Sequence, residues 1–381
     1  MNTKLLTDAQ QQQDQQVVDW LSQLLRKSLE TRASDIHLEP FESLLRIRMR
    51  IDGWLHEIQT PPAAMRDRII SRIKVLAKLD IAEKRLPQDG RLQLSTANRV
   101  VDIRVSTLPT VHGEKAVLRI LDFSSQALDL CKLGLETCAQ MRLIEAISRP
   151  HGLVLITGPT GSGKTVTLYT CLEHINSPKV NIATVEDPAE IVLPGINQVN
   201  VNDKLGLNFA SALRSLLRQD PDILMVGEIR DLETADMAVK ASQTGHLVLS
   251  TLHTNDAPST LIRLRQMGIA PFNMASSISL ISAQRLLRRL CQICKAPVGG
   301  QSRFRAVGCP LCHEGFSGRI GIHQVMPISE AMQAMMLEQA PLKNMAQLAA
   351  SEGVQTLREA GLIKVAAGET TLEEVMSATH G

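Results

Sequence analysis

Two kinds of hydrophobic spacing occur in the first third of the chain. Over Gln16–Arg32, and again over Met65–Leu79, apolar residues recur at helical intervals, which predicts amphipathic helices. Leu44–Ile51 alternates apolar with basic residues, the spacing of a half-buried strand. Further strands are predicted at 35–39, 54–58, 91–95, 100–106 and 115–122. This mixture predicts a compact α+β domain over residues 15–123, after a Gln-rich lead-in, residues 1–14, that we expect to be disordered.

Strand and helix patterns alternate through most of the remaining chain. Strands are predicted at 153–157, 181–186, 223–227 and 247–252, and helices at 137–148, 164–176, 208–219, 232–243 and 257–267. Such alternation indicates a parallel sheet wrapped by helices, with a functional site at the carboxyl ends of its strands. Residues 124–135 carry few signals and are predicted to link the first domain to this second one, residues 136–381.

The end of the chain is predicted to be helical after Arg319. The helices are expected at 330–338, 344–352, 354–367 and 372–378, in a C-terminal segment that spans residues 329–381. Helices at the periphery either cap the core or bind a partner, and the sequence leaves both possibilities open.

The strongest chemical signal is the stretch Leu153–Thr165, LVLITGPTGSGKT. Its second part has the spacing of a phosphate-binding loop, formed by Gly158, Pro159, Thr160, Gly161, Ser162, Gly163, Lys164 and Thr165. Gly161 and Gly163 let the backbone turn its N–H groups towards phosphate oxygens, and the following helix adds its positive N-terminal dipole. Lys164 is expected to reach the β- and γ-phosphates, and the Thr165 hydroxyl to ligate Mg²⁺. The strand before and the helix after make a simple Gly-rich turn the weaker interpretation.

Three more polar stretches follow predicted strands of the second domain. Thr184–Glu190 carries three carboxylates, which would repel a triphosphate unless they hold Mg²⁺ or orient water. Ile223–Asp231 is an apolar strand that ends in Glu228, at the Walker B position where most phosphate-loop proteins carry Asp. His246 and His253 flank a strand and would lie on its opposite faces. Spacing alone would leave these histidines structural.

Four cysteines have the spacing of a zinc site. They occur as Cys291-x2-Cys294-x14-Cys309-x2-Cys312, two knuckles that favour tetrahedral coordination of zinc over a pair of disulfides in a reducing compartment. The other three cysteines, Cys131, Cys138 and Cys171, lack such spacing and are best explained as small apolar residues.

Charge and composition restrict the partners. A net charge of +2, with two Trp, one Tyr and six Phe, gives little support to a nucleic-acid binder. The sequence has no apolar stretch of membrane-spanning length and no secretory leader, so we expect a cytoplasmic protein. One face of the first domain is expected to be basic, with Arg46, Arg48, Arg50, Arg91, Arg104 and Arg119. These arginines are either solvated or meet nucleotide phosphate across an interface.

From about Val17 to the C-terminus the chain resembles the ATPases of type II secretion and type IV pilus assembly, the GspE/PilB-like family. The segments that carry the resemblance are ASDIHLEP (33–40), RLPQDGR (85–91), STLPTVHGEKAVLRIL (106–121), GPTGSGKT (158–165), VEDPAE (185–190), LRSLLRQDPDILMVGEIRDLETA (213–235) and TGHLVLSTLHTN (244–255), together with the four cysteines. The combination of VEDP, the glutamate of GEIRD and the two-histidine strand is specific for this family.

The resemblance implies a RecA-like P-loop ATPase domain preceded by a smaller, PAS-like α+β domain, with a zinc-binding element over residues 288–318. It implies a family acidic box at Glu186, Asp187 and Glu190, and a Walker B glutamate, Glu228, that holds Mg²⁺ through water. Glu190 is a candidate general base for the attacking water, and whether Glu190 or Glu228 is the principal base stays open.

The resemblance also implies roles for histidines and arginines. His246 and His253 match a pair that lies by the phosphates and at the domain contact. Family arginines that contact phosphate between domains or couple subunits correspond to Arg104, Arg119, Arg214 and Arg218. The family forms homo-hexameric rings that bind ATP between the two domains of a subunit. Closure on ATP drives an inner-membrane platform protein, so we expect a protein at the inner face of the bacterial inner membrane that meets the membrane only through partners.

Two departures from the family pattern stand out. Relatives usually carry a further N-terminal domain that docks on a membrane-bound adaptor, whereas this chain begins almost directly at the α+β domain, which suggests a short form. The loop between the cysteine pairs is also shorter than is common in the family, which affects the surface it presents rather than zinc binding.

Three hypotheses follow for the function. The leading one is a hexameric motor ATPase for assembly of a type IV pilus or a type II secretion pseudopilus, because retraction relatives generally lack the four cysteines. The second is a nucleotide-dependent scaffold without motor activity. The third is a nucleic-acid translocase, which the charge and the few aromatic residues disfavour.

Overall fold

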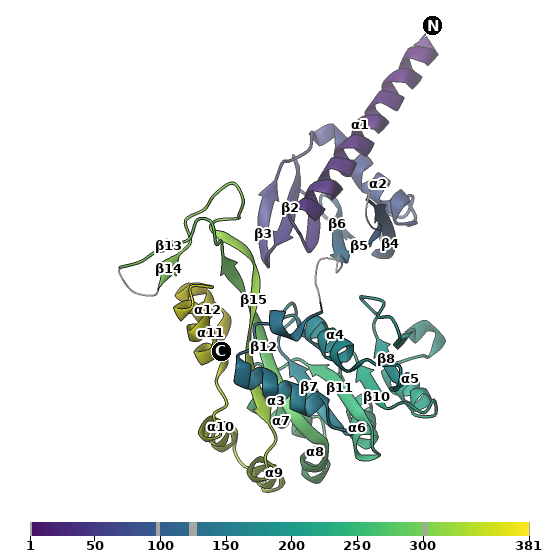
Figure 1. The fold of residues 1–381 in the computed structure, drawn as a ribbon. Helices are drawn as coiled ribbons and strands as arrows, with labels where there is room; N and C mark the ends of the chain where they lie inside the picture. The colour runs from purple at the N-terminus through teal and green to yellow at the C-terminus, as the bar shows by residue number, and fades with distance from the viewer. Residues whose placement is uncertain (1, 97–99, 122–127, 300–302, 381) are drawn as a thin grey trace. The chain divides into compact units, whose positions relative to one another are not determined.

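The structure is a computed structural model that describes residues 2–96, 100–121, 128–299 and 303–380. The chain divides into two compact units, Met1–Gln126 and Ala127–Gly381 (Figure 1). Each unit has its own hydrophobic core.

The first unit is an antiparallel sheet with two helices on one face. Its described elements are α1 (Asn2–Glu30), β1 (Asp35–Pro40), β2 (Leu45–Ile51), β3 (Trp54–Ile58), α2 (Arg66–Leu76), β4 (Gln88–Ser95), β5 (Val100–Thr110) and β6 (Gly113–Leu121). The strands lie in the order β3-β2-β1-β6-β5-β4. Each predicted strand of this part of the chain is present. The expected α+β fold is therefore confirmed.

Alternation along the strands separates an apolar face from a charged one. On β2, for example, Ile47 and Met49 are buried against the helices, while the arginines between them lie on the other face. Below α2 a buried ion pair joins Lys74 to Glu114 of β6 at 2.7 Å, and Lys74 Nζ also donates to the carbonyl oxygen of Glu83. These two contacts of Lys74 fix the chain between α2 and β4.

The N-terminal helix is longer than the sequence indicates. The apolar positions of its second half, such as Leu21 and Leu25, pack on the sheet as expected. The helix begins at Asn2, however, and so includes the Gln-rich lead-in that is predicted to be disordered. Gln is a good helix former, so a helix nucleated on the sheet can continue through this segment.

The second unit is a mostly parallel sheet between two layers of helices. Its strands are β7 (Gly152–Thr157), β8 (Ile182–Glu186), β9 (Asn197–Asn200), β10 (Ile223–Val226), β11 (Leu247–Leu252), β12 (Ile278–Leu290) and β15 (Phe316–Pro327), in the order β15-β12-β7-β11-β10-β8-β9. Only the pairing of β15 with β12 is antiparallel among the described strands of this sheet. A separate two-stranded ribbon pairs β13 (Ala296–Pro297) with β14 (Phe304–Arg305). The parallel sheet confirms the α/β prediction.

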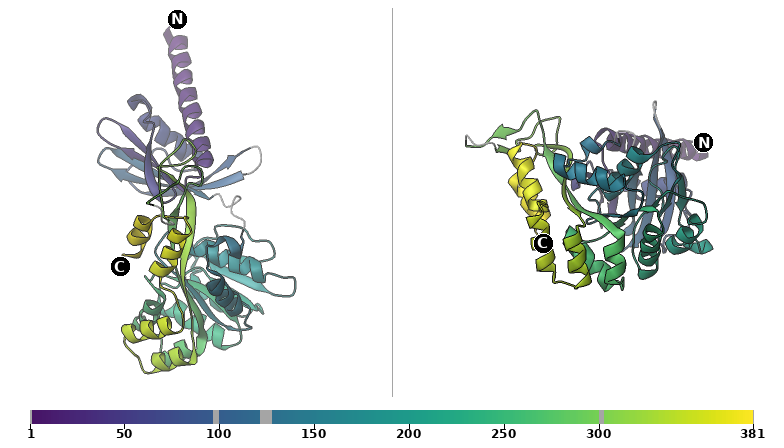
Figure 2. Two further views of the ribbon diagram at one scale, coloured as in Figure 1. Left: turned by 60° about the vertical axis from the view of Figure 1, so that its left-hand side comes forward. Right: turned by 60° about the horizontal axis from the view of Figure 1, so that its bottom comes forward.

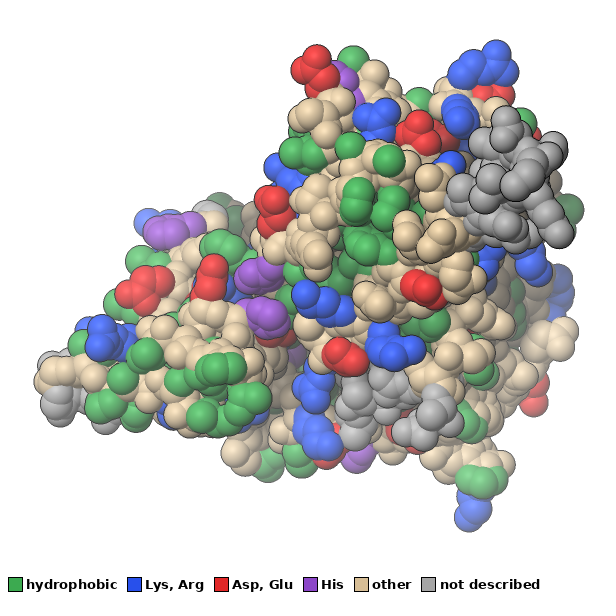
Figure 3. Space-filling model, turned by 90° about the horizontal axis from the view of Figure 1, so that it is seen from above, with side chains coloured by type: hydrophobic (Ala, Val, Ile, Leu, Met, Phe, Trp, Pro, Cys, Tyr) green, Lys and Arg blue, Asp and Glu red, His purple; other side chains and the backbone are tan. Residues whose placement is uncertain are grey.

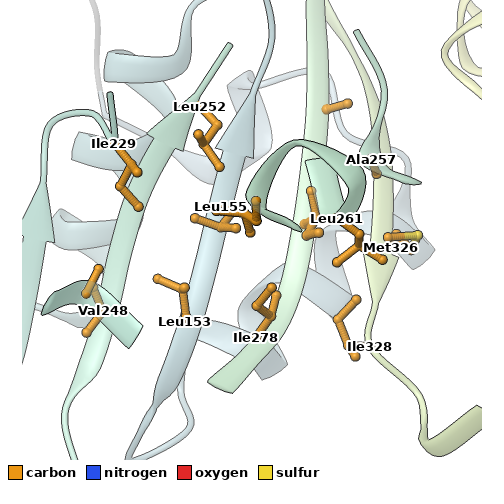
Figure 4. Close-up of a cluster of buried hydrophobic side chains, with 14 of the residues drawn as sticks. Leu153, Leu155, Ile229, Val248, Leu252, Ala257, Leu261, Ile278, Met326 and Ile328 are labelled. Carbon is orange, nitrogen blue, oxygen red and sulfur yellow. The ribbon is translucent and has the colours of Figure 1, made fainter. Parts of the chain in front are cut away.

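Helices cover both faces of this sheet. The helices are α3 (Thr137–Ile147), α4 (Lys164–Ile175), α5 (Phe209–Leu216), α6 (Leu232–Gln243), α7 (Ala257–Gln266), α8 (Pro271–Ser277), α9 (Glu330–Leu337), α10 (Leu342–Ser351), α11 (Leu357–Ala366) and α12 (Leu372–Thr379). Helices α3 and α4 pack on one face, and α5, α6 and α7 pack on the other, where Leu153, Leu155 and Val248 project (Figure 4). The strands β7 and β11 are buried over their whole length because both faces are covered.

Two long strands correct the sequence prediction for residues 278–327. The sequence gives no strand there and expects helices after Arg319, but residues up to Pro327 form β15, which pairs with β12. The apolar runs of these strands are interrupted by buried polar residues, which are Gln284 on β12 and both His323 and Gln324 on β15. The hydrophobic pattern therefore does not indicate strands. The four helices predicted after residue 329 are confirmed, and the last two pack against these strands (yellow in Figure 2).

The predicted linker belongs in part to the second core. Residues 124–127 lie outside the described residues, but Leu128, Leu130, Leu133 and Leu135 all pack on the cluster beneath α3 and α4. The side chain of His323 also hydrogen-bonds to the carbonyl oxygen of Leu133 at 2.9 Å. Apolar residues at alternate positions therefore anchor this segment instead of leaving it as a free connection.

No helix in the described parts of the chain is long and apolar enough to cross a lipid bilayer.

Candidate functional site

The phosphate-binding loop has the geometry that its sequence predicts. Strand β7 ends at Thr157, the loop turns through Gly158, Gly161 and Gly163 at positive φ angles of 151°, 79° and 89°, and α4 begins at Lys164. A Cβ atom at Gly158 would lie 2.6 Å from both the Gln284 carbonyl oxygen and the Ser162 Oγ, so that position requires glycine.

Lys164 lies within the loop that it is expected to serve. Its ammonium group donates to the carbonyl oxygens of Gly158 and Pro159, at 2.8 and 3.1 Å. Burial lowers the pKa of Lys164 to about 8, an effect that Glu228 opposes and Arg285 reinforces. Thr165 is the second residue of α4, at the helix end where the backbone dipole is positive.

The loop is held by a residue that the sequence analysis does not single out. Gln284 of β12 is buried; its amide nitrogen donates to the carbonyl oxygen of Ser162 at 2.7 Å, and its amide oxygen accepts from the hydroxyl of Thr167 on α4 at 2.9 Å. The next residue, Arg285, donates to the carbonyl oxygen of Asn255 at 3.0 Å. The signal for both is a polar pair that stands between the apolar residues Ala283 and Leu286 of β12.

The structure separates the three carboxylates of the acidic stretch. Glu186 is 4% exposed and accepts hydrogen bonds from Tyr169, from Thr184 at 2.5 Å and from Gln198 at 3.0 Å. Asp187 is exposed and Glu190 is half-buried. Glu186 therefore belongs to the protein interior, while Asp187 and Glu190 lie where a bound molecule could reach them.

A second cluster forms where β10 and β11 end. Arg230 pairs with Glu228 and lies 3.6 Å from Asp187, so it joins the Walker B position to the acidic stretch. His253 Nε2 lies 3.5 Å from Glu228 Oε2. The strands β7, β8, β10 and β11 are parallel neighbours, so the phosphate-binding loop and this charged cluster share one edge of the sheet.

The other histidine lies at the opposite edge. His246 precedes β11, where its Nδ1 is 2.9 Å from the carbonyl oxygen of Ala241 and its backbone pairs with Gly152 at the start of β7. Seven residues of extended chain separate the two histidines by roughly 23 Å. His253 therefore follows the strand at the edge that carries the phosphate-binding loop, and His246 precedes the strand at the other edge.

Of the four predicted arginines, Arg119, Arg214 and Arg218 are exposed and Arg104 is half-buried. Arg214, near the end of α5, pairs with Glu233 at 3.1 Å, and Arg218 donates to the carbonyl oxygen of Arg214 at 2.9 Å. In the first unit Arg119 is largely exposed and donates to Asp35 at 2.9 Å. Arg104 stands opposite Arg119 in the register of β5 and β6.

Part of the basic face of the first unit is neutralised internally. Glu39 accepts from Arg46, Arg48 and Lys115, and although burial raises its pKa, these hydrogen bonds lower the pKa of Glu39 to about 2. Arg46 and Arg48 are therefore structural partners of Glu39. The row that continues across the sheet consists of Arg50, Asp35, Arg119, Arg104 and Arg91 in register.

The four cysteines form a cluster that fits a tetrahedral metal. Their sulfur atoms all lie within 4.8 Å of one another, with separations of 3.9 Å between Cys291 and Cys309 and 3.7 Å between Cys294 and Cys312. A Zn–S bond of about 2.3 Å in tetrahedral geometry requires S···S distances of about 3.8 Å. Each knuckle exposes one apolar residue, Ile293 in the first and Leu311 in the second. Hydrophobic side chains gather on the part of the surface that the cysteine-containing segment forms (Figure 3).

Comparison with known families and proteins gives a consistent result. The model of the type II/IV secretion system protein family matches residues 10–377. The chain is 50% identical to the type IV pilus assembly ATPase PilB of Acinetobacter baylyi, an alignment that covers 95% of this chain and 66% of that protein. It is 47% identical to the type II secretion system ATPase E of Vibrio cholerae, over 96% of this chain and 76% of that protein. The chain thus spans about two thirds of the length of the PilB relative.

Solved structures share the fold. The pilus retraction motor PilT, solved with bound ADP, superposes with a TM-score of 0.65 at 26% identity and covers 94% of this chain and 97% of its own. The ATPase DotB of Legionella pneumophila superposes with a TM-score of 0.73 at 21% identity, over 94% of both chains.

Proposed function

The chain belongs to the type II/IV secretion system protein family, and we propose that it is a motor ATPase that hydrolyses ATP to ADP and phosphate. One observation carries this proposal. The phosphate-binding loop and the cluster of Glu228, Asp187, Arg230 and His253 occupy the same edge of the parallel sheet. Such an edge is where parallel α/β sheets bind their ligands, and a loop plus acidic groups is what phosphoryl transfer needs.

Each side chain has a task that its position supports. The loop N–H groups and Lys164 would hold the phosphates of ATP, and Thr165 with Glu228 would hold Mg²⁺, Glu228 through water. The ion would supply charge neutralisation at the transferred phosphoryl group. Glu190 would orient and deprotonate the attacking water, with Glu228 as the alternative base. His253 is within reach of Glu228 and would help to set its position.

We further propose that the protein works as a homo-hexamer in assembly of a type IV pilus or a type II secretion pseudopilus. The relatives named for these systems and the four cysteines support this, and an inner-membrane platform protein is the proposed partner. In the assembled ring Arg104 and Arg119 would contact phosphate, and Arg214 and Arg218 would couple subunits. The protein would then act at the inner face of the membrane, through partners.

The test is the rate of ATP hydrolysis as a function of protein concentration. A rate per chain that rises with concentration, and that falls by about two orders of magnitude in Glu190→Gln or Glu228→Gln, supports an assembled motor. Glu145→Gln, a change at an exposed residue of α3 paired with Arg149, should keep the rate and is the matched control. Bound nucleotide without turnover at any concentration, with platform protein added, would favour the scaffold alternative.

A further inference from the structure

Tyr169 is the one tyrosine of the sequence and is fully buried on α4, the helix that begins at the phosphate-binding loop. Its hydroxyl group contacts the acidic stretch. It donates to the carboxylate of Glu186 at the end of β8, and it accepts the backbone N–H of Glu190 at 3.0 Å. A single side chain therefore joins the helix of the phosphate-binding loop to the backbone of the proposed base.

Glu186 is the fixed point of this arrangement. Besides Tyr169, it accepts from Thr184 on its own strand and from Gln198 on β9. Burial, together with the hydrogen bond to Glu186, raises the pKa of Tyr169 well above its usual value, so the hydroxyl keeps its proton and stays a donor to the carboxylate. A buried carboxyl group that accepts three hydrogen bonds is a stable anchor in the interior.

Other side chains form hydrogen bonds to the backbone of residues 189–193. Asn200 accepts the N–H of Ala189 at 2.7 Å, and Gln198 donates to the carbonyl oxygen of Ile191 at 2.9 Å. Gln198 also accepts the N–H of Leu193 at 2.8 Å. The contact from Tyr169 acts at Glu190 itself, and it comes from the nucleotide-binding helix rather than from the neighbouring strand.

We propose that Tyr169 is a positioning residue for catalysis: its hydroxyl, anchored on Glu186, holds Glu190 at a fixed place relative to the phosphate-binding loop. Glu186 then acts as the anchor of the acidic stretch and not as a base or metal ligand. This inference rests on the proposed ATPase function and on Glu190 as the base. Misplacement of a catalytic group by about 1 Å is enough to cost a large factor in rate.

Two variants separate positioning from stability. Tyr169→Phe and Thr184→Val each remove one hydrogen bond to Glu186, but only the first removes the contact with the Glu190 N–H. We expect Tyr169→Phe to lower kcat by about tenfold or more with little change in KM or in the affinity for ADP. Thr184→Val should keep kcat. Hydrogen exchange in residues 187–193 should accelerate in Tyr169→Phe and stay slow in Thr184→Val.

Each result decides the matter. Equal losses of kcat in the two variants, or a loss in Tyr169→Phe without faster exchange of residues 187–193, would overturn the inference. Should Tyr169→Phe fold poorly, Tyr169→Phe combined with Glu186→Gln removes the buried carboxyl group that has lost its partner and tests the same contact with the Glu190 N–H. If the wild-type protein hydrolyses no ATP, the proposed function fails, and the rates of hydrogen exchange alone test the inference. Faster hydrogen exchange in residues 187–193 of Tyr169→Phe only would support the positioning role. Unchanged hydrogen exchange in that variant would reject it.

Discussion

The side-chain amide of Gln284 donates a hydrogen bond to the carbonyl oxygen of Ser162 over 2.7 Å, from the strand next to the one that carries the phosphate-binding loop. The side-chain amide oxygen of Gln284 accepts a hydrogen bond from the hydroxyl group of Thr167 on α4. One residue of β12 therefore fixes both the loop and the first turns of the helix, and the loop N–H groups are held in a binding conformation by the neighbouring strand.

Replacement of Gln284 by leucine is expected to weaken nucleotide binding. The variant keeps the volume but releases the loop, and a loss of about tenfold in affinity, equivalent to about 1.4 kcal/mol, is the expected result. The measurement is the dissociation constant of ADP with Mg²⁺. Gln324→Leu is the matched control, because Gln324 is a buried glutamine on β15 that instead accepts the N–H of Ala257. Equal affinities in both variants and the wild type would contradict the assigned role.

The stability of the second unit is expected to fall at mildly acidic pH because of His323. Burial lowers the pKa of this histidine from 6.5 to about 4, so the folded state favours the neutral ring. Its contribution is fully present above pH 6.5 and is lost as the pH falls towards 4, because the unfolded state then takes up the proton first. The full loss amounts to about 3 kcal/mol.

Urea unfolding between pH 7 and pH 5 measures this effect. In this interval His323→Gln should show a flatter decline than the wild type, although its stability at pH 7 is lower. His112→Gln, at an exposed position in the first unit, should follow the wild-type curve. A parallel decline in wild type and His323→Gln would show that other groups cause the pH dependence.

Loss of one cysteine ligand is expected to abolish zinc binding. The wild-type protein should carry about one zinc ion per chain, and Cys309→Ser should carry almost none, since three thiolates and a hydroxyl form a much weaker site. Metal analysis after purification, together with the melting temperature with and without a chelator, provides the measurement. Cys138→Ser changes an exposed cysteine outside the cluster and should keep both the metal and the response. Zinc retained by Cys309→Ser would exclude the tetracysteine site.

The sequence predicts most elements of the fold because their patterns are local. The helix over Leu232–Gln243 and the strand over Leu247–Leu252 are found at their predicted bounds, since their apolar spacing is regular. β12 and β15 could not be found in this way. Their pairing joins residues that are separate in the chain, and the buried side chains of Gln284 and Gln324 bond to partners that only the folded structure brings near.

The site shows the same division. The phosphate-binding loop is a contiguous motif, and the spacing of the cysteines is typical of a four-cysteine zinc site. Both sites could therefore be predicted from the sequence. The partition of the acidic stretch into a buried Glu186 and an accessible Glu190 was not, because it depends on Tyr169 and Gln198 from other elements. The place of His246 before β11 and of His253 after it agrees with the prediction that the two histidines flank a strand.

The arginine row of the first unit makes its folding sensitive to anions. Arg91, Arg104 and Arg119 stand opposite one another on β4, β5 and β6, and Asp35 meets the row at Arg119. Like charges directly opposite each other disfavour strand pairing, and the ion pair of Arg119 with Asp35 offsets part of that repulsion. A polyanion laid along these strands would remove that repulsion, and the melting temperature of the unit would then report whether the row is occupied.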